Sequence, residues 1–104
     1  MLMPKLYEYF GLLILFYSNE HEPIHVHGVD ADGRELKAGI IVENGKVKKI
    51  CFVAVGHVPP LTGSRLKDFK TLVKVRAEDI VQKWIDFFVF KKHLKMVRIT
   101  KRVK

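Results

Sequence analysis

The feature that most constrains the fold is a change in the spacing of apolar residues at Pro59-Pro60. Before it, β-branched and aromatic residues form short runs separated by turn residues, which is typical of strands. After it, apolar residues recur every three or four positions, which is typical of an amphipathic helix. Two adjacent prolines continue neither element, because proline lacks the backbone N–H. We therefore expect an α+β domain with a strand half and a helical half.

The strand half, residues 1–56, predicts an antiparallel meander of about five strands. We expect the strands near residues 5–10, 12–18, 24–29, 35–42 and 47–55. Asn44-Gly45 is the clearest turn signal, because a two-residue type I′ hairpin needs positive φ at both positions. Asp32-Gly33 gives a similar signal for the preceding hairpin.

The helical half predicts one long amphipathic helix within residues 62–90, with Thr62 or Ser64 as its cap. Its apolar stripe, over about residues 64–88, consists of Leu66, Phe69, Val73, Ala77, Ile80, Trp84 and Phe88. Such a stripe covers one face of a sheet and gives a two-layer domain. In the basic segment 91–104, alternation over 94–100 predicts a last strand at the sheet edge.

Length and charge narrow the class of protein. A chain of 104 residues is enough for one domain with one hydrophobic core, so residues 1–104 are taken as a single domain. Residues 1–52 carry 6 Lys or Arg against 7 Asp or Glu, whereas residues 53–104 carry 13 against 4. The net charge of +8 therefore lies in the helix and tail, and it predicts a nucleic acid or an acidic protein as partner.

The basic residues follow an unusual order along the predicted helix. Helices favour acids in the first turn and bases in the last, whereas here the bases come first and Glu78 and Asp79 come later. A binding role would explain this order, and a solvated basic face is the alternative. The residues expected to bind the partner are Lys70, Lys74, Arg76, Lys91, Lys92, Lys95, Arg98, Lys101 and Arg102.

The sequence predicts a cytoplasmic location without membrane insertion. The longest N-terminal apolar run, residues 9–17, is about half of the roughly 20 residues that a spanning helix needs. No small-residue cleavage site follows it. Cys51 is the single cysteine, which excludes an intramolecular disulfide and suits a reducing compartment, and we expect it to be a small core residue.

The most specific segment holds three of the 5 histidines, His21, His25 and His27. On a strand over 24–29, His25 and His27 point to the same face, because strand side chains alternate. Glu20 and His21 then lie near the mouth of that strand, held by the stiff Pro23.

This pattern suits two chemistries. A divalent metal such as zinc would be held by Glu20, His21, His25 and His27. Alternatively, His25 and His27, assisted by His21, would act as general base and acid on an RNA phosphodiester without any cofactor. A third interpretation is that these histidines only order the sheet. His57 and His93 are interpreted as surface residues and Trp84 as a core residue.

Several enzyme classes lack their motifs here. The chain has no Cys-x-x-Cys pair, no His-Glu-x-x-His helix, no phosphate-binding Gly-Lys-Ser/Thr loop and no Gly-x-Ser-x-Gly elbow.

The chain resembles a bacterial and archaeal family of small proteins of unknown function. The matching motif runs through Pro4, Phe10-Gly11, Phe16-Tyr17, Glu20-His21, Pro23, His25 and His27. Similar stretches follow at Lys37-Ala38, at Gly45-Lys46-Val47 and over 78–84. Members are often encoded beside a second small domain, and some are identified as the toxin of a type II toxin–antitoxin pair.

The resemblance and the residues together predict a toxin-like protein that acts on RNA or its machinery, with an acidic antitoxin as partner. If it is an enzyme, it would be a histidine-dependent or metal-dependent ribonuclease. The alternative is a non-catalytic module that binds nucleic acid or an acidic protein, with structural histidines. A homodimer formed through an exposed sheet edge is a third possibility.

Overall fold

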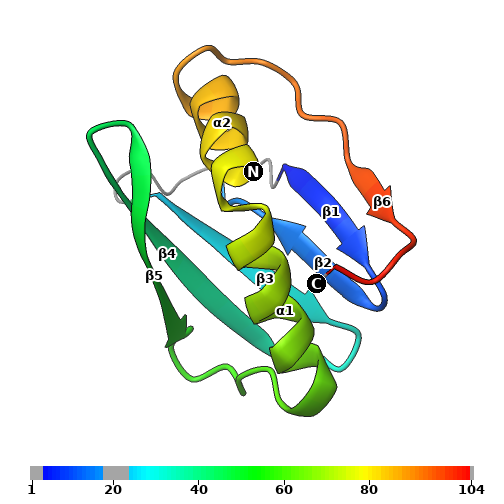
Figure 1. The fold of residues 1–104 in the computed structure, drawn as a ribbon. Coiled ribbons are helices and arrows are strands. Elements are labelled where there is room, and N and C mark those ends of the chain that lie inside the picture. Colours follow the sequence, from blue (N-terminus) through cyan, green and yellow to red (C-terminus); the bar gives the residue numbers. More distant parts are fainter. Residues whose placement is uncertain (1–3, 18–23, 104) are drawn as a thin grey trace.

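The structure, a computed structural model, describes residues 4–17 and 24–103. It is an α+β protein with a mixed sheet of six strands in the order β5-β4-β3-β2-β1-β6, together with two helices (Figure 1). The strands are β1 (Lys5–Tyr9), β2 (Leu12–Leu15), β3 (His25–Asp30), β4 (Glu35–Glu43), β5 (Lys46–Ala54) and β6 (Val97–Ile99). The helices are α1 (Gly63–Val75) and α2 (Ala77–Phe88).

The first five strands form the predicted antiparallel meander, each pairing with the next along the chain. Their bounds lie within a few residues of the expected ones. Asn44 and Gly45 have φ values of 55° and 78°, so the turn between β4 and β5 has positive φ at both positions, as predicted.

The last strand differs from the predicted antiparallel arrangement. β6 pairs with β1 in parallel, so the sheet is mixed. The chain passes from the β5 edge through both helices, and the linker after α2 then brings it to the other edge, where β6 enters from the end at which β1 begins (Figure 1). Parallel neighbours require such a crossover connection.

The prediction of one long helix is wrong, because the chain forms α1 and α2 with Arg76 between them. Arg76 has φ −103° and ψ 13°, outside the helical region, although its N–H still donates to the Leu72 carbonyl at 2.8 Å. The sequence before it, Thr71 to Val75, contains three β-branched residues, which are poor helix formers. In the described ranges, neither helix has the length and apolar character needed to cross a membrane.

The break also explains the order of charges. Glu78 and Asp79 lie in the first turn of α2, and Lys74 lies in the last turn of α1. Each group therefore occupies the helix end that suits its charge. The break removes the inversion at the junction alone, because α1 has no acid in its first turn and α2 has no base in its last turn.

Both helices cross the same face of the sheet (Figure 1). Their buried side chains, among them Phe69, Val73, Ile80 and Trp84, pack on strand residues such as Tyr7, Ile14 and Val26 to form the core. Trp84 is thus a core residue, as predicted.

The opposite face, here called the helix-free face, carries the alternate strand residues Leu13, Leu15, His25, His27, Glu35, Lys37 and Cys51. Cys51 is half-buried on this face and outside the core, so its expected core position is wrong. The alternation of side chains on β5 explains the difference, because neighbouring Ile50 and Phe52 face the helices instead.

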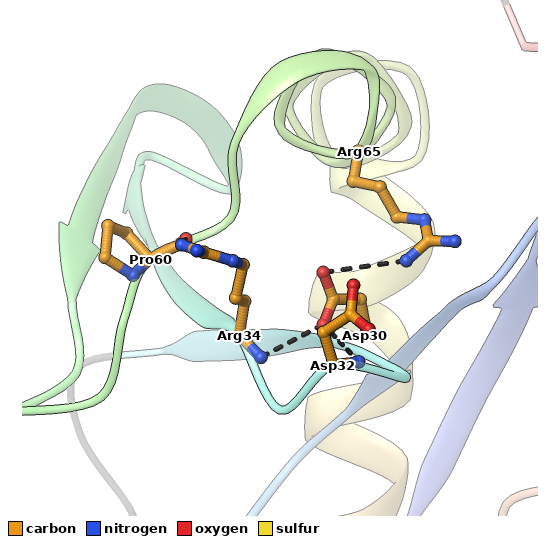
Figure 2. Close-up of polar contacts among 5 residues, drawn as sticks. All are labelled: Asp30, Asp32, Arg34, Pro60 and Arg65. Carbon is orange, nitrogen blue, oxygen red and sulfur yellow. Dashed lines mark hydrogen bonds and ion pairs between the residues drawn. The ribbon is translucent and has the colours of Figure 1, made fainter.

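The turn between β3 and β4 is held by Asp30, whose side chain is buried (Figure 2). Its Oδ1 accepts hydrogen bonds from the backbone N–H groups of Asp32 and Arg34 at 2.9 and 3.0 Å. The Arg65 guanidinium on α1 lies 3.6 Å from Oδ2. Asp30 therefore fixes the hairpin and joins it to the helix layer, which sets the position of Glu35 at the start of β4.

Candidate functional site

Four side chains from three segments come together on the helix-free face. His25 and His27 lie on β3, Glu35 begins β4, and Tyr17 follows β2. The two histidine rings have their centroids 5.6 Å apart, so both point to one side of the strand, as alternation predicts. His27 is 1% exposed, whereas His25 is half-buried.

His27 is held by both neighbours. Its Nδ1 lies 2.8 Å from Glu35 Oε2, and the Tyr17 hydroxyl donates to the same oxygen at 2.5 Å. The rings of Tyr17 and His27 stack with their centroids 4.0 Å apart and an interplanar angle of 26°. The imidazole is thus fixed in position and in rotation.

This geometry assigns a tautomer. A Glu35 carboxylate can only accept hydrogen bonds, so the proton of a neutral His27 lies on Nδ1. Nε2 then keeps its lone pair and can accept a proton or ligate a metal. Carboxylate contacts of this kind orient both catalytic and metal-ligating histidines.

Lys37 adds a positive charge beside the cluster. It is the Cα partner of His27 in the ladder between β3 and β4, so the two side chains share the helix-free face. Lys37 is half-buried. An amine at this place can bind a phosphate that approaches the histidines.

Glu20 and His21 lie outside the described residues, so their predicted roles stay predictions. Within residues 4–17 and 24–103, no group of three or more His, Cys, Asp or Glu side chains is arranged to hold a metal ion. A zinc site of the predicted composition would therefore depend on Glu20 and His21.

Sequence reasoning missed Glu35, Tyr17 and Lys37 as site residues. The available signal was the Asp32-Gly33 turn, because a hairpin closed there pairs Val29 with Glu35 and His27 with Lys37. His57 and His93 are both exposed, as predicted.

The structure places the nine predicted basic residues on several elements, and four of them, Arg76, Arg98, Lys101 and Arg102, line one groove. Lys70 and Lys74 line a groove along α1, and Arg76 lies at the junction of the helices. Lys91, Lys92 and Lys95 lie on the linker between α2 and β6, Arg98 is on β6, and Lys101 and Arg102 follow it.

Acidic side chains on β1, α1 and α2 pair with part of this charge. Arg98 lies 3.2 Å from Glu8 on β1, Arg102 pairs with Asp68 on α1, and Lys92 is 4.0 Å from Asp86. The basic run of the sequence is therefore partly neutralised in the fold. Arg76 lies over the Tyr7 ring at 5.8 Å, and Lys70 lies over the Phe52 ring at 5.5 Å.

These features define the class: a small α+β protein with helices on one face of a mixed sheet and a Tyr–His–Glu cluster on the other. The family described as Domain of unknown function (DUF4160) matches residues 11–85, which include His25, His27 and Glu35, and the chain belongs to this family. This confirms the expected membership of a family of unknown function. No curated protein and no solved structure matches the chain.

Proposed function

We propose that the helix-free face is an acid–base site for RNA phosphodiesters and that the protein is the toxin-like member of a two-protein module in the cytoplasm. The observation that carries this proposal is the fixed His27 beside the more accessible His25. Burying an imidazole and a carboxylate costs free energy unless the two groups pair. A histidine whose only role is to order the sheet would not require a second histidine on the same face.

Burial gives the two histidines different parts in this proposal. His25 is half-buried and its Nε2 is covered, so it would meet the substrate through Nδ1. His27, held by Glu35 and Tyr17, would either donate or accept a proton itself or hold the neighbouring His25 ring in position. His21 is the third predicted participant.

The proposed reaction is cleavage by the neighbouring ribose. His25 would take the proton of the 2′-hydroxyl, whose oxygen attacks the adjacent phosphorus. The bond from phosphorus to the 5′ oxygen breaks, and that oxygen leaves with a proton from a second histidine, His27 or His21, which enters the reaction in its imidazolium form. Lys37 would stabilise the negative charge on the phosphate oxygens.

A metal-dependent version uses the same residues. The Glu35 contact to His27 Nδ1 is the contact that orients a metal-ligating imidazole. Zinc held by three of the four residues His25, His27, His21 and Glu20 would leave a position for an activated water. Elemental analysis of the purified protein, with cleavage assays before and after chelation, separates the two versions.

Purified protein and a single-stranded RNA test the site. We expect cleavage that leaves a 2′,3′-cyclic phosphate if the chemistry is metal-free, and His25→Ala should lower the rate by about a hundredfold or more. His93→Ala, which changes an exposed histidine on the linker, is the matched control and should cleave normally.

Growth assays test the toxin role. Expressed without a partner, the wild-type chain should inhibit growth, and the His25→Ala/His27→Ala variant should not. A folded double variant that inhibits growth as strongly as wild type would contradict the catalytic proposal.

A second candidate is a non-catalytic module that binds nucleic acid or an acidic protein. The observation that favours it is that His27 is buried and paired, as a purely structural histidine would be. Such a module would lose RNA affinity steeply with salt and would be indifferent to His25→Ala. Light scattering of the same samples would test the predicted homodimer through an exposed sheet edge.

A further inference from the structure

An open groove of about 620 Å³ lies on the other side of the molecule from the histidine cluster. It is bounded by the end of α1, by β6 and by the segment that follows β6, and we call it the C-terminal groove. Its lining residues are Val75, Arg76, Val97, Arg98, Ile99, Thr100, Lys101, Arg102 and Val103. Figure 1 shows this last segment turning back from β6 toward α1.

The floor of the groove is aliphatic. Val75 and Val97, which are far apart in the sequence, are 49% and 44% exposed at its two sides. Ile99 and Val103 between them are partly buried against the core. Adjacent exposed aliphatic side chains in a concave site favour contact with apolar groups of a partner.

The rim is basic. Four cations line the groove, namely Arg76, Arg98, Lys101 and Arg102, and none of the described lining residues is acidic. Glu8 and Asp68 pair with Arg98 and Arg102 from outside the lining. Arg76 and Lys101 therefore give the rim a net positive charge, which favours an anionic ligand.

We propose that the C-terminal groove binds an acidic peptide segment of a partner protein, one in which aliphatic and acidic side chains alternate. The aliphatic floor would take the apolar side chains, and the rim would take the carboxylates. RNA fits less well, because among the described residues that line the groove none is aromatic and able to stack on a base, and the nearby Phe10 ring is already covered by Arg102. This inference is independent of the histidine chemistry proposed above.

The ligand match is tested with a short fluorescent peptide of alternating leucine and glutamate, using anisotropy with the full chain. The peptide should bind, a leucine–lysine peptide of equal length should not, and oligouridine should not displace it. Absence of binding to the acidic peptide, or displacement by oligouridine, would overturn the proposal.

Variants locate the binding. Val97→Asp places a carboxylate on the floor, and Lys101→Glu reverses one rim charge, so each should weaken peptide binding by roughly tenfold. If Val97→Asp does not fold, Val75→Asp is the alternative, because it places a carboxylate in the same groove from the end of α1. Lys49→Glu, on the exposed β5 edge, makes the same charge change elsewhere and should bind as wild type. An equal loss in Lys49→Glu would assign the binding to net charge and overturn the groove.

Discussion

The ring of Phe69 on α1 lies against the backbone of Gly28 on β3, so closely that a Cβ at position 28 would be 2.5 Å from Phe69 Cδ1. Phe69 is fully buried, and its ring cannot withdraw without opening the layer between helix and sheet. The contact lies on the strand that carries His25 and His27, so it couples the helix layer to the candidate site.

Gly28→Ala should therefore lower the free energy of unfolding by about 1–3 kcal/mol, through overpacking. Urea unfolding followed by circular dichroism measures it. Gly39→Ala on the neighbouring strand is the matched control, because its added Cβ would meet only the Cys51 carbonyl, at 4.0 Å. That control should be neutral or stabilising by a few tenths of a kcal/mol, roughly, since alanine restricts the unfolded chain. Equal losses in both variants would contradict the role of Phe69.

Asp30→Ala should destabilise the protein by about 1–3 kcal/mol, because two backbone N–H groups lose their acceptor. Asp30→Asn keeps an oxygen at that place and should cost less, losing mainly the charge that faces Arg65 (Figure 2). Asp32→Ala alters an exposed carboxylate in the same turn and should have little effect. Thermal unfolding of the three variants gives the order, and a large loss in Asp32→Ala would refute it.

Glu35→Ala should cost more stability than Tyr17→Phe. The first change removes the oxygen that both His27 and Tyr17 contact, whereas the second removes one donor and keeps the stacked ring. We expect about 2–3 kcal/mol for Glu35→Ala and about 1 kcal/mol for Tyr17→Phe. A double-mutant cycle between them should show a clear coupling energy. If the free-energy losses of the two single variants were additive, Tyr17 and Glu35 would not be energetically coupled.

Tyr7 predicts how stability depends on alkaline pH. Burial raises the pKa of the Tyr7 phenol well above its ordinary value of 10.0, and the hydrogen bond that it donates to Asp79 adds to the rise. Below pH 10 the phenol is neutral in both states, so its contribution is fully present. Above pH 10 the unfolded chain ionises first, and stability falls by about 1.4 kcal/mol per pH unit from this group.

The matched variant is Tyr7→Phe, which lacks the ionisable hydroxyl. It should be less stable than wild type near neutrality by about 1 kcal/mol, the value of one hydrogen bond. The difference should shrink and reverse as pH rises above 10. Urea unfolding at several alkaline pH values measures it, and a constant difference would show that Tyr7 does not titrate with unfolding.

The sequence predicted those features of the fold that depend on residues close together in the chain. The five-strand meander, the Asn44-Gly45 turn and the buried stripe from Phe69 to Trp84 follow from alternation, turn chemistry and helical spacing. The break at Arg76 also had a local signal, because Glu78 and Asp79 are acids of the kind found in the first turn of a helix. One continuous apolar stripe concealed it, since the stripe runs on through the break.

The remaining features depend on contacts between distant segments. Glu35 is recognisable as a partner of His27 only once the register of β3 on β4 is known. The parallel pairing of β6 with β1 depends on how far the helices carry the chain across the sheet. The acids Glu8 and Asp68, which neutralise Arg98 and Arg102, are likewise far away in sequence.

The position of β1 between β2 and β6 has a consequence for assembly. Among β1 to β5 every pairing joins strands that are neighbours in sequence, so we expect the meander to form without β6. β6 must close on β1 across a long loop, as the contact between Arg98 and Glu8, 90 positions apart, illustrates. Until then one edge of β1 presents unpaired backbone groups. We therefore expect the free edge of β1 to be covered late in folding, when β6 pairs with it.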